Sequence, residues 1–342
     1  MTRREFLQII CGVVATSLVS TRVFSRLPRK NIVTGPTRIA HIEGGTIFDR
    51  AKAAVDALGG ISRFVKAGDA VVIKPNAAFV QTPGMGGNTT PDVLRAVIQL
   101  CTGARAGSVT VVEHCLSSHG RFGTARDPSG LTRAALEEGA RLLDAGSDPA
   151  NYTEVELDAP DIRSHGFISA FLEADAVINV PRAKTHPWAG YTLCVKNLMG
   201  MMRNPGILHA WKEWNWIESH YHGVLDRLGI QKSRRGYSAL PVNLVALAKF
   251  MQDRVDLNIV DMTDLVRDWS AVKAGTLERK NAIVAGTDMV SVDAYCIGIF
   301  GEDPLGEWKS SPIDNYIRMM HEEKIGNADI RTATLIHDVL EG

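Results

Sequence analysis

The sequence predicts an α/β fold with a mostly parallel sheet, flanking helices and a helical, aromatic-rich insertion. Short β-branched runs alternate with segments of helical periodicity, polar residues follow most of these runs, and an aromatic-rich segment interrupts the alternation at 201–240. The chain has 342 residues, 45% of them hydrophobic, and can therefore bury a sizeable core. Its 38 basic and 38 acidic residues balance, so the composition indicates no nucleic-acid partner.

Residues 1–30 have the features of a twin-arginine export signal. Arg3 and Arg4 precede an apolar run at 9–19, which is shorter than the roughly 20 residues that span a bilayer. We therefore expect the twin-arginine translocase as a partner and a location in the periplasm or extracytoplasmic envelope. No clean Ala-x-Ala site follows the run, which leaves open both cleavage and retention as an uncleaved N-terminal anchor.

The α/β domain is expected over 35–305, with elements in regular order. Strands are predicted where short apolar runs stand between turn formers, and helices where apolar residues recur at helical spacing after a capping residue. The expected strands are 38–42, 70–73, 108–112, 176–180, 257–260 and 282–285. The expected helices are 46–58, ended by Gly59 and Gly60; 91–101, with Thr90 as N-cap and Pro91 at its first position; one beginning at Thr192; 240–252; and 293–299.

Two segments depart from this alternation. Residues 209–222 hold three tryptophans and three histidines, with the larger apolar residues at helical spacing, so we interpret 201–240 as a lid or insertion over the site. Residues 306–342 are expected to form a C-terminal helical extension.

Chemically useful side chains follow the predicted strands at their carboxyl ends, where open α/β sheets bind ligands. Lys74 and Asn76 follow the second strand, and His114 follows the third. Lys184 and His186 follow the fourth. We therefore expect these side chains to share one site for a small anionic ligand. Four acids also lie at or just beyond strand ends, and helix capping is the expected role of Asp264 and Asp288: Asp261, Asp264, Asp288 and Asp293.

Lys196 extends this site. With Thr192 as N-cap, Lys196 lies in or just after the first helical turn, where the helix dipole costs a cation about 0.3–1 kcal/mol. A bound anion, or a group attached covalently to the amine, would offset that cost. The equally weighted alternative is that Lys184 and Lys196 are ordinary solvated lysines.

The cysteines give no sign of a metal centre. All five are widely spaced and no CxxC occurs, which argues against a ferredoxin-type cluster or a zinc ribbon in this chain, and we assign no metal ligand. The twin-arginine route exports folded proteins that commonly carry a cofactor, so an unidentified cofactor is expected.

Several motifs together resemble the DUF362 family, a domain of unknown function, over about 35–305. They are Lys74-Pro75-Asn76, Lys184-Thr185-His186, Val195-Lys196-Asn197-Leu198-Met199-Gly200, and Gly286-Thr287-Asp288 through Asp293-Ala294. Several members of that family carry an attached ferredoxin-like cluster domain. Because this chain lacks the corresponding cysteines, electron transfer would need a separate redox partner.

The central stretch is more distantly similar to the lactate racemase family, which uses a nickel pincer cofactor. His186 precedes an Ala-Gly-aromatic sequence, Lys196 lies ten residues later, and His114 follows a hydrophobic strand. This resemblance implies two proton-transfer histidines and a covalently lysine-linked or metal cofactor. At the place of the family's nickel-binding histidine this chain has Lys212, with His209 close by.

Two classes of function follow. One is an oxidoreductase or racemase-like enzyme for small hydroxy- or oxo-acids, with His114 and His186 as general acid and base. In this hypothesis the cofactor or anionic ligand is held by Lys74, Asn76, Lys184 and Lys196. The alternatives are a non-catalytic periplasmic binding protein for a small anion, which would tolerate His→Gln changes, and a redox-partner protein.

The export hypothesis generates a direct prediction. Replacing both Arg3 and Arg4 by lysine should leave the protein in the cytoplasm, because the twin-arginine pathway reads the paired guanidinium groups. Cell fractionation followed by immunoblotting measures this, and an unchanged envelope fraction would contradict the prediction.

Overall fold

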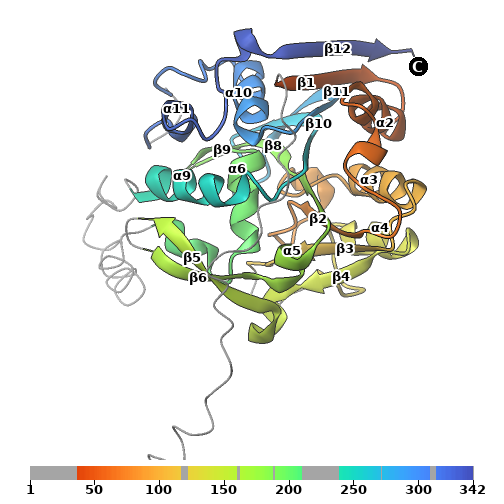
Figure 1. The fold of residues 1–342 in the computed structure, drawn as a ribbon. Coiled ribbons are helices and arrows are strands. Elements are labelled where there is room, and N and C mark those ends of the chain that lie inside the picture. Colours follow the sequence, from red (N-terminus) through yellow and green to blue (C-terminus); the bar gives the residue numbers. More distant parts are fainter. Residues whose placement is uncertain are drawn as a thin grey trace, which may run out of the picture.

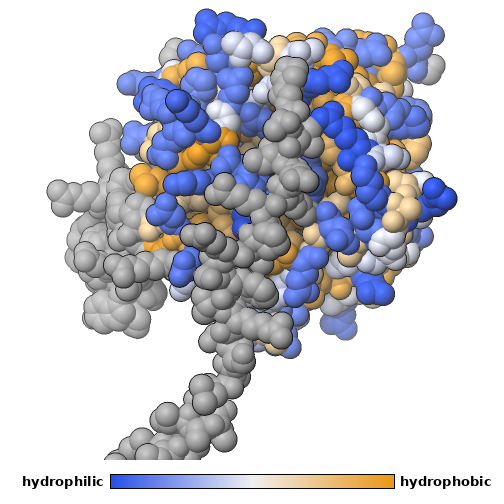
Figure 2. Space-filling model, in the orientation of Figure 1, coloured by the Kyte–Doolittle hydropathy of each residue, from blue (hydrophilic) through white to orange (hydrophobic). Residues whose placement is uncertain are grey.

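The computed structural model describes residues 37–116, 122–159, 162–187, 189–209, 239–270, 272–308 and 313–341. The expected export signal at 1–30, most of the expected lid, and Lys212 lie outside the described residues. In the described part of the chain, no helix combines the length and hydrophobicity that a membrane crossing requires. Figure 2 shows hydrophilic residues over much of the visible surface, with hydrophobic ones interspersed, which is ordinary for a folded chain.

Ten of the described strands form one sheet, in the order β12-β1-β11-β10-β7-β2-β3-β4, with β8 attached to β10 and β9 attached to β8 (Figure 1). Their bounds are β1 (Arg38–Gly44), β2 (Ala70–Pro75), β3 (Ser108–Glu113), β4 (Arg141–Asp144), β7 (Ala176–Val180), β8 (Arg182–His186), β9 (Gly190–Thr192), β10 (Leu257–Arg267), β11 (Thr276–Gly286) and β12 (Thr334–Leu340). Neighbours from β4 through β10 run parallel, whereas β11 is antiparallel to both β10 and β1. The predicted mostly parallel α/β fold is confirmed. A separate antiparallel pair consists of β5 (Tyr152–Ala159) and β6 (Ile162–Ile168).

Helices cover both faces of the sheet (Figure 1). One face carries α2 (Ile47–Ala57), α3 (Pro91–Gly103) and α4 (Leu131–Glu137), and the other carries α6 (Cys194–Asn197), α9 (Ala239–Met251), α10 (Met289–Ile299) and α11 (Tyr316–Glu322). Shorter helical pieces are α5 (Ser169–Glu173), η1 (Ile61–Arg63), η2 (Pro83–Met85), η3 (Ala145–Ser147), η4 (Pro149–Asn151), η5 (Leu198–Met201), η6 (Pro205–His209) and η7 (Ile330–Thr332).

The strands feed two hydrophobic cores because successive side chains point to opposite faces. In β2, Val71 and Ile73 pack in the core under α2 and α3, whereas Val72 packs in the core under α9 and α10. The central strands are therefore continuous apolar runs, as parallel strands covered on both sides require.

Capping residues and hydrophobic periodicity predicted the positions of most helices and strands correctly. Thr46 caps α2 with a complete capping box in which its side chain and that of Asp49 bond to each other's backbone. The Asp288 carboxylate accepts hydrogen bonds from the backbone of Val290 and Ser291, which confirms the predicted cap of α10.

The structure corrects two expectations about element type. No strand was expected between 180 and 192, but the stretch after Pro181 pairs as the β8–β9 hairpin, whose strand β8 extends along β10. The C-terminal extension is only partly helical, because α11 is followed by β12, which pairs in parallel with β1. The edge strand β12 forms because it pairs with the distant strand β1, and the sequence at 334–340 alone does not indicate this pairing.

Asp288 also bonds beyond its own helix, since its carboxylate accepts from the backbone N–H of Asn327 at 2.8 Å. We expect Asp288→Ala to lower the free energy of unfolding by about 1–2 kcal/mol, because an acceptor for several backbone amides is lost. Asp288→Asn keeps an acceptor and serves as the matched control. Urea denaturation measures both variants, and equal midpoints for Ala and Asn would contradict this role.

Candidate functional site

One cavity of about 350 Å³ lies at the carboxyl ends of β2, β3 and β8 and is bordered by α6 and η6. This volume is at the lower end of the range for small-molecule sites. The cavity is lined by all six of the side chains predicted to form a site: Lys74, Asn76, His114, Lys184, His186 and Lys196. The expected convergence at the strand ends is therefore found in the structure.

Lys74 is neutralised by a carboxylate. Its amine lies 2.8 Å from Glu113 Oε1, and both side chains are only 1% exposed. Burial lowers the pKa of Lys74 and raises that of Glu113, while the contact between them favours their charged forms. A Cβ at Gly200 would lie 2.3 Å from Glu113 Oε1, so glycine is the residue that this close approach permits.

Lys184 is also engaged within the protein. Its amine donates to Asn76 Oδ1 at 3.1 Å and to the carbonyl of Gly87, and it lies 3.8 Å from the ring centroid of Trp269. Burial lowers its pKa well below the ordinary lysine value, and the positive charges of Lys196 and Arg182 add to this effect. Lys184 thus holds Asn76, Gly87 and Trp269 together and is also part of the cavity wall.

Four asparagine amides continue this hydrogen bonding across the sheet. Asn76 donates to Asn197, Asn197 donates to Asn179, and Asn179 donates to Asn258, at 2.9, 2.8 and 2.9 Å. The four residues lie just after β2, in α6, in β7 and in β10, and all four are buried. Satisfied amides of this kind fix side-chain orientation, because an unpaired buried amide is costly.

His114 is oriented by a hydroxyl group. Its Nδ1 lies 2.6 Å from the hydroxyl of Tyr152 on β5. Burial lowers its pKa, and the nearby Asp144 works in the opposite direction. His114 is half-buried, so its ring combines a fixed orientation with access to the cavity.

His186 has a defined tautomer. The backbone N–H of Ala189 donates to its Nδ1 at 3.1 Å, so we assign the proton of the neutral ring to Nε2. Burial lowers the pKa of His186 well below its ordinary value, with further lowering from Lys196, Lys184 and His209. His209, which the sequence placed within the expected insertion and close to the position of the related family's nickel-binding histidine, lines the same cavity.

Lys196 differs from the other two lysines. Its amine makes no hydrogen bond or ion pair with any residue that the structure describes, and burial lowers its pKa to about 8. Lys196 lies in the first turn, as expected, but α6 has only four residues, so this single turn is also its last and provides no helix dipole of the expected size. What distinguishes Lys196 is a half-buried amine that none of the described residues pairs with.

The support for α6 comes from a distant acid. Thr192 belongs to β9 and is not the N-cap; instead the Asp293 carboxylate accepts from the backbone of Cys194 at 2.7 Å and of Val195 at 3.0 Å. Burial raises the pKa of Asp293 to about 7. Asp293 thus connects α10 to the start of the segment that carries Lys196.

Arg182 is not part of the cavity wall. Its guanidinium group pairs with Asp261 at 2.7 Å and with Asp264 at 2.9 Å, and it donates to the hydroxyl of Thr90. Asp264 is therefore an ion-pair partner and not the expected helix cap. The hydroxyl of Thr90 stands at the start of α3 without capping it, since it is bonded to Arg182.

The sequence analysis missed several residues of the wall. Glu113 and Asn197 lie beside predicted site residues, so their neighbours were a usable signal, whereas nothing near Trp269 in sequence indicates its position over Lys184. The four cysteines of the described chain are buried thiols, and no disulfide joins them: Cys101, Cys115, Cys194 and Cys296.

The lowered pKa of Lys196 can be measured directly. At pH 8 about half of its amines should be neutral, against less than about 1% for an ordinary lysine of pKa about 10.4. Reaction of the lysines with an amine reagent, followed site by site with mass spectrometry across pH 6–11, should therefore show half-maximal modification of Lys196 near pH 8. Lys196→Arg identifies the peptide signal, and a midpoint near pH 10.5 would contradict the structure.

Comparisons with known proteins place the chain in a family. Thylakoid-associated protein sll1697 from Synechocystis sp. is 30% identical over 179 residues, which are 49% of this chain and 50% of that protein. The chain thus spans about half the length of this curated relative. The lactate racemase apoprotein from Thermoanaerobacterium thermosaccharolyticum superposes with a TM-score of 0.47 and 16% identity, covering 80% of this chain and 58% of that one. A protein from Thermotoga maritima superposes with a TM-score of 0.44 and 11% identity, covering 76% and 60%.

The family match covers the candidate site. The profile described as "Domain of unknown function (DUF362)" matches residues 71–298, a span that begins in β2, ends in α10 and includes all six predicted site residues. Because this match extends over more than half of the chain, the protein belongs to the DUF362 family.

Proposed function

We propose that this protein is an enzyme that moves a proton or a hydride on a small hydroxy- or oxo-acid. One observation carries the proposal: two histidines with lowered pKa values and a lysine amine with a pKa of about 8 line a single small cavity. The neutral rings can accept a proton and the Lys196 amine changes protonation near neutral pH, and acid–base catalysis requires groups with these properties.

The charges around the cavity favour an anionic substrate. Lys74 has Glu113 as its counter-ion, but neither Lys184 nor Lys196 pairs with a carboxylate of the described chain. These two lysines lower the pKa of His186, which means that positive charges repel one another there. A substrate carboxylate would relieve this repulsion, and the apolar surfaces of Phe79, Met199 and Trp269 would accept a small carbon skeleton.

The two histidines take complementary roles in this proposal. The neutral ring of His186 carries its proton on Nε2 and offers that N–H as a hydrogen-bond donor to a substrate oxygen, since its Nδ1 accepts from the Ala189 amide. His114, oriented by the Tyr152 hydroxyl, is the base. Asn76 positions Lys184, and the ion pair between Lys74 on β2 and Glu113 on β3 fixes that part of the cavity wall.

Lys196 is the residue that would hold a covalently attached cofactor. The fit rests on its amine, which lacks a hydrogen bond or ion pair among the described residues and is partly neutral near pH 8. Such a group, when bound, would supply hydride-accepting chemistry. A separate redox partner would then be needed to exchange electrons with the protein.

We place this activity in the periplasm or another extracytoplasmic compartment, with twin-arginine export as the route. The support is the pair Arg3 and Arg4 before a short apolar run. The name of the relative from Synechocystis describes it as thylakoid-associated, which agrees with a location at a membrane system.

A non-catalytic anion-binding protein is the second candidate. The observation that favours it is that each histidine uses its Nδ1 in a structural hydrogen bond, to Tyr152 for His114 and to Ala189 for His186. In a binding protein these rings would serve only to shape a cationic cavity.

The two candidates differ in the effect of His→Gln changes. The purified protein is incubated in D2O with single enantiomers of small 2-hydroxy acids, with and without a dye electron acceptor, and the products are analysed by NMR and chiral chromatography. For the enzyme, we expect His114→Gln and His186→Gln each to lower racemisation, exchange or dye reduction by about 10²–10⁴-fold.

The control is His321→Gln, because His321 lies on α11 outside the cavity wall and its Nδ1 accepts a hydrogen bond from the backbone N–H of Ala328. This variant should keep wild-type activity. If the wild type binds an acid but leaves it unchanged under all these conditions, the binding-protein candidate replaces the enzyme.

A further inference from the structure

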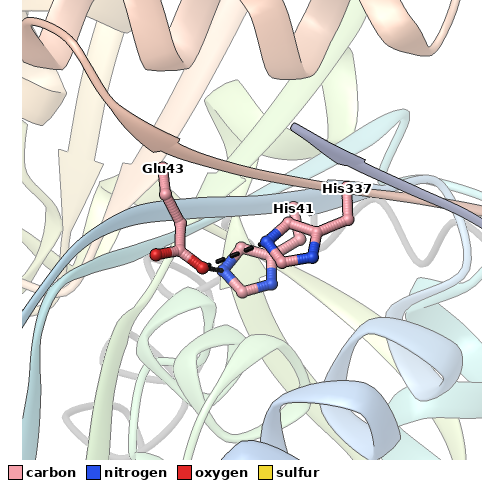
Figure 3. Close-up of side chains that lie close together, drawn as sticks. All are labelled: His41, Glu43 and His337. Atoms are coloured by element: carbon pink, nitrogen blue, oxygen red, sulfur yellow. Dashed lines mark hydrogen bonds and ion pairs between the residues drawn. The ribbon is translucent and has the colours of Figure 1, made fainter. Parts of the chain in front are cut away.

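A second cluster of side chains that can bind metal lies outside the cavity, where β1 and β12, the first and last described strands in the sequence, pair with each other. In the parallel pairing of β1 with β12, His41 stands opposite His337, and Glu43 stands two residues further along β1. Figure 3 shows the three side chains on one face of these strands, with both rings directed toward the carboxylate. None of the three lines the candidate functional site.

The separations of the donor atoms suit one metal ion. His41 Nε2 lies 3.4 Å and His337 Nε2 lies 3.1 Å from Glu43 Oε1, and one ligand atom from each of the three residues lies within 4.8 Å of the others. Tetrahedral zinc with bonds of about 2.0–2.2 Å separates its ligand atoms by about 3.3 Å. Two of the three separations are already at that value.

A second residue orients the buried ligand. His41 Nδ1 lies 2.8 Å from the hydroxyl of Tyr295 on α10. A metal-binding histidine commonly donates its other ring N–H to an oxygen, which fixes the tautomer and leaves the remaining nitrogen lone pair for the metal. With Nδ1–H directed to Tyr295, His41 presents Nε2 to Glu43 and His337.

We propose that His41, Glu43 and His337 form a binding site for a first-row divalent transition metal such as Zn²⁺. The ligand atoms are His41 Nε2, Glu43 Oε1 and His337 Nε2, and water completes the coordination. Imidazole and carboxylate ligands suit zinc and its neighbours in the first transition row.

Binding requires one local adjustment. The two imidazole rings are stacked at 4.5 Å with an angle of 10° between their planes, so their lone pairs run side by side. The His337 side chain is 47% exposed and has room to turn its Nε2 toward the ion, whereas His41 is buried and held by Tyr295. The nearby positive charge of Lys280 is offset by its ion pair with Glu278 at 2.7 Å.

Metal binding would hold the C-terminal strand β12 in place on the sheet. Among the described strands, β12 pairs only with β1 and lies at the edge of the sheet. A metal ion that shares ligands from both strands would hold the last strand of the fold to the first. Because the ligands come together only in the folded chain, binding would raise thermal stability.

The test uses Zn²⁺ alone as the probe, added to the full chain after removal of metal with a chelator. Calorimetric titration and thermal unfolding are measured on the wild type, His337→Gln, Glu43→Gln and the double variant His114→Gln/His186→Gln. The matched control is Asp338→Asn, an exposed acidic neighbour on β12 outside the cluster. His337 is exposed, so its replacement should leave the fold intact.

We expect His337→Gln and Glu43→Gln each to weaken one Zn²⁺-binding event by at least about tenfold and to abolish the rise in Tm that Zn²⁺ produces. Asp338→Asn and the double variant of the functional site should retain both. Absence of Zn²⁺ binding in the wild type, or equal binding by His337→Gln and Asp338→Asn, would show that the cluster is an ordinary His–Glu ion pair and would overturn the proposal.

Discussion

The architecture of the candidate site depends on a line of buried hydrogen bonds that runs across the sheet. Lys184 donates a hydrogen bond to Asn76. Each asparagine side chain then donates to the next one, in the order Asn76, Asn197, Asn179 and Asn258. Every link lies out of contact with bulk water, so breaking one leaves a polar group unpaired at a cost of about 1–3 kcal/mol. The line ties β8, the end of β2, α6, β7 and β10 into a fixed arrangement, and three of its members, Lys184, Asn76 and Asn197, line the cavity.

This arrangement separates the cations into two kinds. Lys74 and Arg182 have carboxylate partners, and Lys184 is engaged by an amide, a carbonyl and an aromatic ring. Lys196 alone of these four lacks a hydrogen bond or ion pair among the described residues. Burying an amine without a partner lowers its pKa and raises its nucleophilicity, which is useful in a site that binds an anion or carries a covalent group.

The antiparallel strand β11 lies between the two candidate sites of the sheet. It separates the parallel strands, whose carboxyl ends carry the cavity, from the β1–β12 pair, which carries His41, Glu43 and His337. Tyr295 and Asp293 lie on the same helix, α10, and contact these two regions: Tyr295 orients His41, while Asp293 holds the start of α6. A single helix therefore supports both the candidate metal cluster and the segment of Lys196.

The sequence by itself determined the α/β class, most strand and helix positions, the cap at Asp288 and the gathering of six polar residues at the strand ends, because hydrophobic period, capping and strand direction are local properties. Tertiary structure alone decided the rest. Whether Arg182 faced the cavity depended on Asp261 and Asp264, about eighty residues away, and the support for the start of α6 came from Asp293. Likewise β12 became a strand because β1 offers it an edge. Such pairings join residues far apart in the chain. Their energies come from packing and burial, which local sequence patterns do not predict.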